Sequence, residues 1–206
     1  MESGLVFFSA AKFEVAPVLS MLDKHQISYS YFEFGVGPIN AAKSSVQLKE
    51  VVNNKNVIYL GSAGTFSSFD KPYLCKVNNV LWLPTAERMC LAKHMESLYQ
   101  PLKIVDTHHF DLPIKRVLTS TSVSLVNDIC LDSVSERHQL VENMEAYALL
   151  MELIDSTKNL DLILGITNGV GPKGSEQWAT YFMQIAQMTA DYLEDNIMLL
   201  KELSST

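Results

Sequence analysis

Cysteine is scarce in this sequence, with three residues among 206. Cys75, Cys90 and Cys130 are odd in number, far apart and never in a C-x-x-C spacing. This distribution argues against a disulfide framework and against a cysteine-based zinc site. We therefore predict buried thiols in a reducing compartment, the cytoplasm, and no bound metal.

Charge is also limited, since 19% of the residues are charged whereas 48% are hydrophobic. That balance is the opposite of a disordered chain and suffices for the core of one domain spanning residues 1–206. The formal net charge is −7, and no cluster of Lys and Arg offsets it locally. Because such a protein repels phosphate backbones and acidic lipids, a nucleic-acid partner is not expected.

Long hydrophobic runs are absent as well. No stretch approaches the roughly 20 apolar residues that a membrane-spanning helix needs. The apolar run Leu5–Phe8 follows no basic segment and is soon interrupted by Lys12 and Glu14. It predicts a first β-strand rather than a signal peptide, and no membrane partner is expected.

Short apolar runs alternate along the chain with segments of helical periodicity. This alternation predicts an α/β fold, a three-layer α/β/α sandwich around a central mixed, largely parallel sheet. A long amphipathic helix begins near Ser175, and the segment Thr65–Lys115 is the least regular. The other expected strands are Leu5–Ser9, Ile27–Phe34, Asn56–Leu60, Asn79–Leu83, Arg116–Ser120 and Leu160–Ile166, and the other expected helices are Phe13–Leu22, Ala41–Val52, Glu87–Leu98 and Glu142–Leu153.

Polar and glycine-rich residues directly follow several of these strands, at the edge of a parallel sheet where ligands bind. Glu14 opens the first helix, glycine-rich segments at 35–37 and 61–64 stop two strands, and Asn168 follows a buried strand. Each has an ordinary explanation, because a carboxylate complements a helix dipole and glycine or asparagine forms turns. Asn40 stands where a dinucleotide motif has its third glycine, and no cofactor is expected.

Two further carboxylates, Glu142 and Glu145, are three residues apart and are expected on one side of a helix. Apolar residues follow Glu145 at once, and a buried carboxylate is costly unless it has a partner. A ligand with hydroxyl groups, such as a ribose, is a suitable partner.

The order of these segments resembles one superfamily. The motifs S-A-A-x-F-E-V, G-V-G-x-x-x-A-A, G-S-A-G, E-N-M-E-A and I-T-N are similar to those of the nucleoside phosphorylase and nucleosidase superfamily. The similarity runs from Leu5 to about Tyr192, apart from the weakly matched Thr65–Lys115. Within the superfamily the chain resembles the hydrolytic branch, 5′-methylthioadenosine/S-adenosylhomocysteine nucleosidase and, more closely, futalosine hydrolase. The resemblance implies a purine nucleoside as substrate and a homodimer or higher homo-oligomer.

The resemblance also implies catalytic roles for Glu14, Glu145 and Asn168. Glu145 would accept hydrogen bonds from the ribose hydroxyls and favour a cationic transition state, while Met144 would pack on the sugar. Glu14 would orient or deprotonate the attacking water. The remaining substrate contacts would come from Ser62, Ala63, Gly64, Val123, Ser124 and Trp178. By itself, Trp178 is more simply explained by core packing.

Adenine-specific nucleosidases have aspartate at the position of Asn168. An amide cannot deliver a full proton, but its NH₂ group can donate a hydrogen bond to N7 or O6 of the departing base. The sequence therefore favours a 6-oxopurine nucleoside such as futalosine over 5′-methylthioadenosine.

Arginine is as scarce as cysteine, with Arg88, Arg116 and Arg137 alone. Phosphorylases must hold phosphate, for which arginine forks are the usual means. None of the three lies beside Gly37 or just before Gly61, which favours hydrolysis, although Arg88 could enter from the irregular region or from a partner subunit. A phosphorylase, and a nucleoside-binding protein without catalysis, remain as alternatives.

Overall fold

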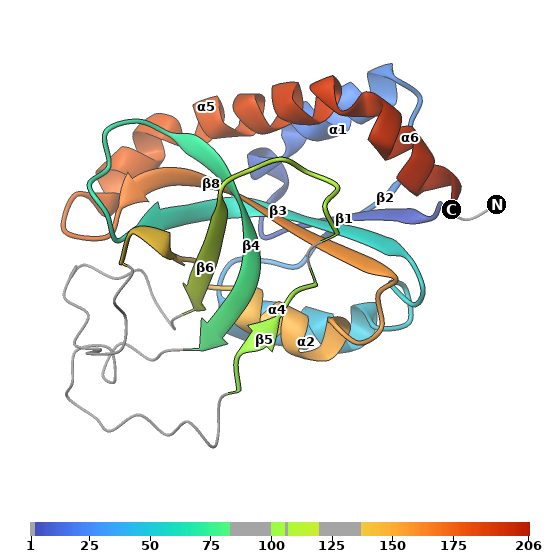
Figure 1. The fold of residues 1–206 in the computed structure, drawn as a ribbon, viewed down its shortest axis with the longest axis horizontal. Coiled ribbons are helices and arrows are strands. Elements are labelled where there is room, and N and C mark those ends of the chain that lie inside the picture. Colours follow the sequence, from blue (N-terminus) through green and yellow to red (C-terminus); the bar gives the residue numbers. More distant parts are fainter. Residues whose placement is uncertain (1–2, 83–99, 106, 120–136) are drawn as a thin grey trace.

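The computed structural model describes residues 3–82, 100–105, 107–119 and 137–206. Within these ranges a mixed β-sheet lies between two groups of helices (Figure 1). Helices α1 (Ala16–Lys24), α5 (Gly174–Asp195) and α6 (Ile197–Ser205) cover one side, and α2 (Pro38–Leu48) and α4 (Ala146–Leu153) cover the other. The strands are β1 (Leu5–Ser9), β2 (Ser30–Glu33), β3 (Asn56–Thr65), β4 (Tyr73–Trp82), β5 (Leu102–Lys103), β6 (Ile114–Thr119), β7 (Leu140–Glu142) and β8 (Asn159–Gly169).

The sheet curls back on itself. Its order is β2-β1-β3-β7-β6-β4-β5, and β8 pairs with both β3 and β4, so that β3, β7, β6, β4 and β8 form a closed ring. Strands β3 and β7, β4 and β8, and β4 and β5 pair antiparallel, and the other pairs are parallel. The predicted mixed α/β fold is confirmed. The predicted three-layer sandwich is not, because this ring makes the sheet barrel-like.

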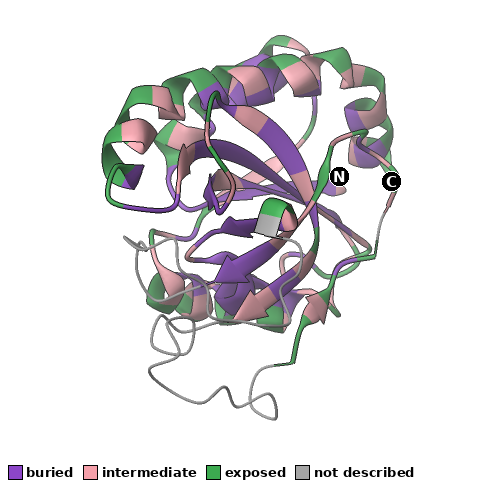
Figure 2. Ribbon diagram, turned by 60° about the vertical axis from the view of Figure 1, so that its left-hand side comes forward, coloured by how far each residue is buried: buried purple, intermediate pink, exposed green. Residues whose placement is uncertain are grey.

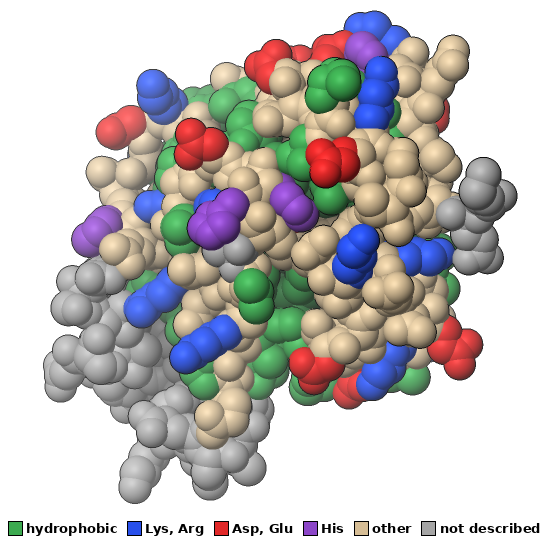
Figure 3. All heavy atoms as spheres, turned by 45° about the vertical axis from the view of Figure 1, so that its right-hand side comes forward, with side chains coloured by type: hydrophobic (Ala, Val, Ile, Leu, Met, Phe, Trp, Pro, Cys, Tyr) green, Lys and Arg blue, Asp and Glu red, His purple; other side chains and the backbone are tan. Residues whose placement is uncertain are grey.

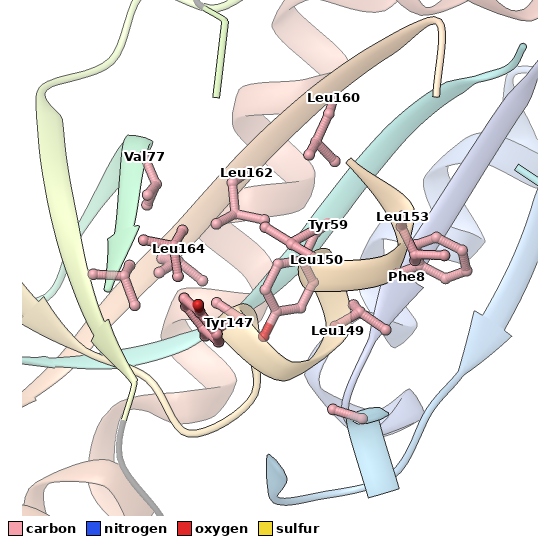
Figure 4. Packing of buried hydrophobic residues seen from close by; sticks show 14 of the residues in the cluster. Phe8, Tyr59, Val77, Tyr147, Leu149, Leu150, Leu153, Leu160, Leu162 and Leu164 are labelled. Carbon is pink, nitrogen blue, oxygen red and sulfur yellow. The ribbon is translucent and has the colours of Figure 1, made fainter. Parts of the chain in front are cut away.

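Alternating residues of β1 explain why helices cover both faces of the sheet. Leu5 and Phe7 pack with α1, α5 and α6, whereas Val6 and Phe8 pack with α2 and α4. Because side chains along a strand point alternately to opposite faces, a strand that is apolar throughout needs a hydrophobic cover on each face. Figure 2 shows the buried strands inside and the exposed helix faces outside, and Figure 4 shows leucines of α4 packed towards β8.

Several predicted elements differ from those observed. The glycine-rich segment 61–64 does not stop a strand but continues β3 to Thr65, because it pairs with β8 along its whole length. Glu142 lies at the end of β7 rather than in a helix, so the prediction that Glu142 and Glu145 share a helix side is wrong. The final helix is broken at Asn196.

Other predictions agree with the structure or concern residues outside the described ranges. The strand Leu5–Ser9 is observed with the expected bounds. Cys75 is free and buried, as predicted. The helix expected at Glu87–Leu98, and the cysteines Cys90 and Cys130, lie outside the described residues.

Gly165 on β8 lies where the sheet meets helix α5, and a side chain there would collide with that helix. A Cβ atom at this position would come within 2.0 Å of the Ile185 Cγ2 atom. We expect Gly165→Ala to lower the free energy of unfolding by about 1–3 kcal/mol, as overpacked cores do. Urea denaturation measures this loss.

The double variant Gly165→Ala with Ile185→Ala provides the control. Removing the Ile185 methyl groups makes room for the new Cβ atom. The double variant should therefore lose less free energy of unfolding than the sum of the losses in the two single variants. Strict additivity would contradict the proposed collision.

Candidate active site

A cavity of about 480 Å³ opens where β3, β7 and β8 end. Figure 1 shows β3 and β8 running in the same direction towards this end of the sheet. The cavity is lined by Ala10, Phe13, Glu14, Val36, Tyr59, Gly61, Ser62, Ala63, Gly64, Glu142, Asn143, Met144, Glu145, Asn168, Gly174, Ser175, Trp178 and Ala179. All the predicted site residues within the described ranges are among them.

Asn168 reaches the cavity through an irregularity in the sheet. Ala63 pairs with Ile166 but Gly64 pairs with Asn168, so Thr167 is an extra residue on β8. Such bulges re-aim the side chains that follow them. A Cβ atom on Gly64 would lie 2.8 Å from Asn168 Nδ2, so only glycine at position 64 leaves room for this amide.

Hydrogen bonds fix the orientation of the Asn168 amide. Thr167 Oγ1 donates to Asn168 Oδ1 at 2.8 Å, and Asn168 Nδ2 donates to the Gly169 carbonyl at 3.1 Å. Because an amide NH₂ carries two hydrogens, one donor remains for another acceptor.

Glu145 precedes α4 and is buried, with 5% of its surface exposed. Its Oε1 atom accepts a hydrogen bond of 2.8 Å from the Gly37 backbone amide. Gly37 adopts a φ of +90°, a conformation that favours glycine. A backbone amide of the glycine-rich turn before α2 thus binds the Glu145 carboxyl group.

Asn143 holds the start of α4 in place. Its Oδ1 atom accepts hydrogen bonds from the backbone amides of Glu145 at 2.9 Å and Ala146 at 2.8 Å, while its Nδ2 atom donates to the Ser62 carbonyl at 3.1 Å. An asparagine just before a helix commonly satisfies the free amides in this way. Asn143 thereby ties α4 to β3 and was missed by the sequence analysis, although its position before the helix was a usable signal.

Glu14 lies in the short 3₁₀ turn Lys12–Glu14 and lines the same cavity. Ser62 Oγ donates to Glu14 Oε1 at 2.7 Å, and Trp178 Nε1 donates to Ser62 Oγ at 3.1 Å. The Trp178 ring also stacks on Phe182, with centroids 5.0 Å apart. Trp178 therefore lines the cavity and donates a hydrogen bond there. Core packing alone does not explain this position.

Both carboxyl groups bind protons more tightly than ordinary glutamates. The pKa of Glu145 is raised to about 7, chiefly by burial; the hydrogen bond from Gly37 opposes the rise and the charge of Glu14 adds to it. Burial also raises the pKa of Glu14, an effect partly offset by the Ser62 hydroxyl. Strongly perturbed carboxyl groups in a cleft are typical of functional sites.

The structure brings together Glu14, Ser62, Ala63, Gly64, Met144, Glu145, Asn168 and Trp178. Val123 and Ser124, which were also predicted to contact the base, lie outside the described residues. The sequence analysis did not anticipate Phe13, Tyr59 or Asn143 as lining residues. Phe13 lies edge-on to the Trp178 ring, with centroids 6.2 Å apart.

Charged side chains, helix lengths and metal-ligating residues of the described ranges bear on other kinds of site. On the face shown in Figure 3, basic and acidic side chains are interspersed. No helix in the described ranges is long and apolar enough to cross a membrane. The same residues contain no group of three or more His, Cys, Asp or Glu side chains that could hold a metal ion.

No protein-family model matches the sequence, and no curated protein matches it either. The structure does match solved structures of nucleosidases over nearly their whole length. This chain thus has the same fold as these solved enzymes, in agreement with the fold that the sequence motifs implied.

Three enzymes illustrate this structural match. A mutant 5′-methylthioadenosine/S-adenosylhomocysteine nucleosidase of Helicobacter pylori, with 5′-methylthioadenosine in its active site, gives a TM-score of 0.74 at 10% identity, over 96% of this chain and 99% of its own. Futalosine hydrolase of the same organism gives 0.74 at 10% identity, over 94% and 97%. The nucleosidase of Streptococcus pneumoniae with 8-aminoadenine gives 0.72 at 14% identity, over 94% and 98%.

Proposed function

We propose that this protein is a purine nucleosidase that hydrolyses the N-glycosidic bond of a 6-oxopurine nucleoside. The observation that carries the proposal is that the buried carboxyl group of Glu145 and the partly buried one of Glu14 line one cavity with Met144 and Asn168. These residues come from separate parts of the chain. Their meeting is what a reaction with a cationic sugar and a departing base requires.

In this proposal Glu145 holds the ribose. The Gly37 amide donates to Oε1, and the carboxylate has further lone pairs that can accept hydrogen bonds from the 2′- and 3′-hydroxyls. Its negative charge, in a poorly solvated position, stabilises the positive charge that develops on the sugar. Met144 supplies an apolar surface beside the ribose.

Glu14 takes the proton of the attacking water. The water oxygen forms a bond to the anomeric carbon as the C–N bond breaks, and the bonding electron pair leaves with the purine. Asn168 donates its remaining N–H to N7 or O6 of the base, which stabilises the developing negative charge until the base takes a proton from solvent.

The electrostatics of the cavity favour water over phosphate as the nucleophile. Three carboxyl groups, those of Glu14, Glu142 and Glu145, line the cavity, and its described lining includes no arginine or lysine. A phosphate dianion would be repelled here unless cations from elsewhere joined the site. Hydrolysis is therefore preferred over phosphorolysis, the second candidate reaction.

The proposal extends to the oligomeric state, the cellular compartment and the substrate. We infer a homodimer or higher homo-oligomer in the cytoplasm, with futalosine or a similar nucleoside as substrate. The similarity to both futalosine hydrolase and 5′-methylthioadenosine nucleosidases leaves the adenine-type substrates as the alternative that must be tested.

The first experiment is chromatography of inosine, futalosine, 5′-methylthioadenosine and S-adenosylhomocysteine after incubation with pure protein, with and without phosphate. Free base released without phosphate supports the nucleosidase, and the fastest substrate identifies its branch. Release that requires phosphate would establish a phosphorylase instead. No release from any of the four would favour a nucleoside-binding protein.

Asn168→Asp is expected to shift the substrate preference from 6-oxopurine towards 6-aminopurine nucleosides by about tenfold or more, since a protonated carboxyl can donate a full proton to N7. The measurement is the ratio of kcat/KM for inosine and adenosine in the variant and the original protein. Asn78→Asp, an exposed change on β4, is the matched control. An unchanged ratio would show that Asn168 does not contact the base.

A further inference from the structure

The indole of Trp178 and the carboxyl group of Glu14 are joined through one serine hydroxyl. Trp178 Nε1 lies 3.1 Å from Ser62 Oγ, which lies 2.7 Å from Glu14 Oε1. An indole N–H is a donor only, so it must meet a lone pair of the Ser62 oxygen. The single O–H of Ser62 is then left to donate to Glu14.

We propose that Trp178 is a positioning residue for Glu14, and that it acts by orienting the Ser62 hydroxyl. The proposal rests on the role of Glu14 in the proposed function. It differs from a substrate contact, because the effect of the indole N–H must pass through Ser62.

The surroundings hold the indole in the orientation that this relay needs. Trp178 stacks on Phe182, with an angle of 14° between the rings, and Phe13 meets its edge. All three rings belong to α5 or to the turn that carries Glu14. Through these ring contacts, α5 packs directly against the turn that carries the Glu14 carboxyl group.

The relay favours the ionised form of Glu14. A hydroxyl that donates to a carboxylate stabilises its charge, and the Ser62 bond accordingly opposes the rise in pKa that burial causes. Without the indole, the Ser62 hydroxyl is free to rotate away. The proton affinity of Glu14 should then rise and its orientation should loosen.

Ionisable groups of the remaining elements lie around Glu14. Helix α5 contributes non-ionising side chains to this neighbourhood, at Trp178, Phe182, Ile185 and Thr189. The ionisable groups around the carboxyl are Tyr31 on β2, Tyr59 on β3, Glu142 on β7 and Glu145 before α4. Because these groups remain in place when Trp178 is changed, a shift in the titration of Glu14 reports the relay itself.

The test is a double-mutant cycle between Trp178→Phe and Ser62→Ala. Phenylalanine keeps an aromatic ring against Phe182 but removes the N–H donor. We expect Trp178→Phe to lower kcat about fivefold, the value of one hydrogen bond, with KM changed by less than about twofold. In the Ser62→Ala background the same substitution should have no further effect on kcat.

A second readout does not depend on activity. The titration of the Glu14 carboxyl carbon is followed by NMR, and its signal is assigned by its loss in Glu14→Gln. The pH of half-titration should rise in Trp178→Phe and in Ser62→Ala, and should rise no further in the double variant. Circular dichroism melting verifies that each variant is folded.

The outcomes separate this proposal from the proposed function. An unchanged Glu14 titration in Trp178→Phe, or an equal effect of that change with and without Ser62, would overturn the relay even if the protein hydrolyses nucleosides. A shifted titration in a protein that hydrolyses none would support the relay and refute the nucleosidase.

Discussion

Glu14→Gln is expected to lower kcat for nucleoside hydrolysis by about a hundredfold to ten-thousandfold, the usual contribution of a general base. Glutamine can accept the hydrogen bond from Ser62 but cannot take a proton from water. Because the shape of the cavity is kept, the affinity for the free purine should change by no more than about threefold. Chromatography of the released base measures the first effect and calorimetry measures the second.

Glu50→Gln is the matched control, since Glu50 is exposed and lies outside the cavity. It should leave both quantities unchanged. A Glu14→Gln variant with normal turnover would remove Glu14 from the mechanism. A large loss of purine affinity would instead indicate that the carboxyl group is needed to shape the base site.

Glu145→Gln is expected to make the protein more stable at neutral pH and at least about a hundredfold less active. Burial raises the pKa of Glu145 to about 7 in the folded protein, compared with an ordinary value of 4.5. The folded state therefore holds a proton that the unfolded state has lost between these two pH values. The free energy of unfolding contributed by this group falls as pH rises through that window.

Glutamine does not titrate, so the variant escapes this loss. Its stabilisation relative to the original protein should be absent below the unfolded pKa and should reach about 3 kcal/mol above pH 7. The Gly37 amide can still donate to the glutamine oxygen. Thermal melting at pH 4 and pH 8 measures the difference, and a variant equally stabilised at both pH values would contradict the ionisation of Glu145 as its cause.

The opposing effects of Glu145→Gln on activity and stability have one cause. A carboxylate without enough partners destabilises the folded protein, and the same unmet hydrogen-bonding capacity is what the ribose hydroxyls would satisfy. Saturating nucleoside should consequently stabilise the original protein more than it stabilises the variant.

The parts of the fold that local pattern governs were predictable from the sequence. β1 was predicted with its observed bounds because a short apolar run, followed soon by charged residues, is typical of a buried strand. The chain positions of Glu14, Glu145 and Asn168, which follow or precede apolar segments, also indicated one edge of the sheet. The boundaries of β3 and α4 were predicted less well.

Those errors have physical reasons. Glycines at positions 61 and 64 have weak strand propensity, but pairing with β8 over the whole of β3 supplies the hydrogen bonds that offset it. Glu142 was predicted to be helical because it lies three residues before Glu145, a spacing that places two side chains on one side of a helix. The Asn143 side chain, however, accepts hydrogen bonds from the backbone amides at the start of the helix, which begins at Ala146. Glu142 therefore lies before the helix and pairs with Leu118 in the sheet.

The sequence by itself determined the mixed α/β fold class, the superfamily resemblance and eight of the eighteen residues that line the cavity, since these depend on apolar periodicity and on short motifs. Only the tertiary structure decided how the sheet closes, which groups hold the two carboxyls, and that Trp178 reaches Glu14 through Ser62. These features depend on hydrogen bonds between residues more than 45 positions apart, such as the 108 positions between Gly37 and Glu145. The distance and orientation of such pairs are set by packing across the sheet, which no local pattern records.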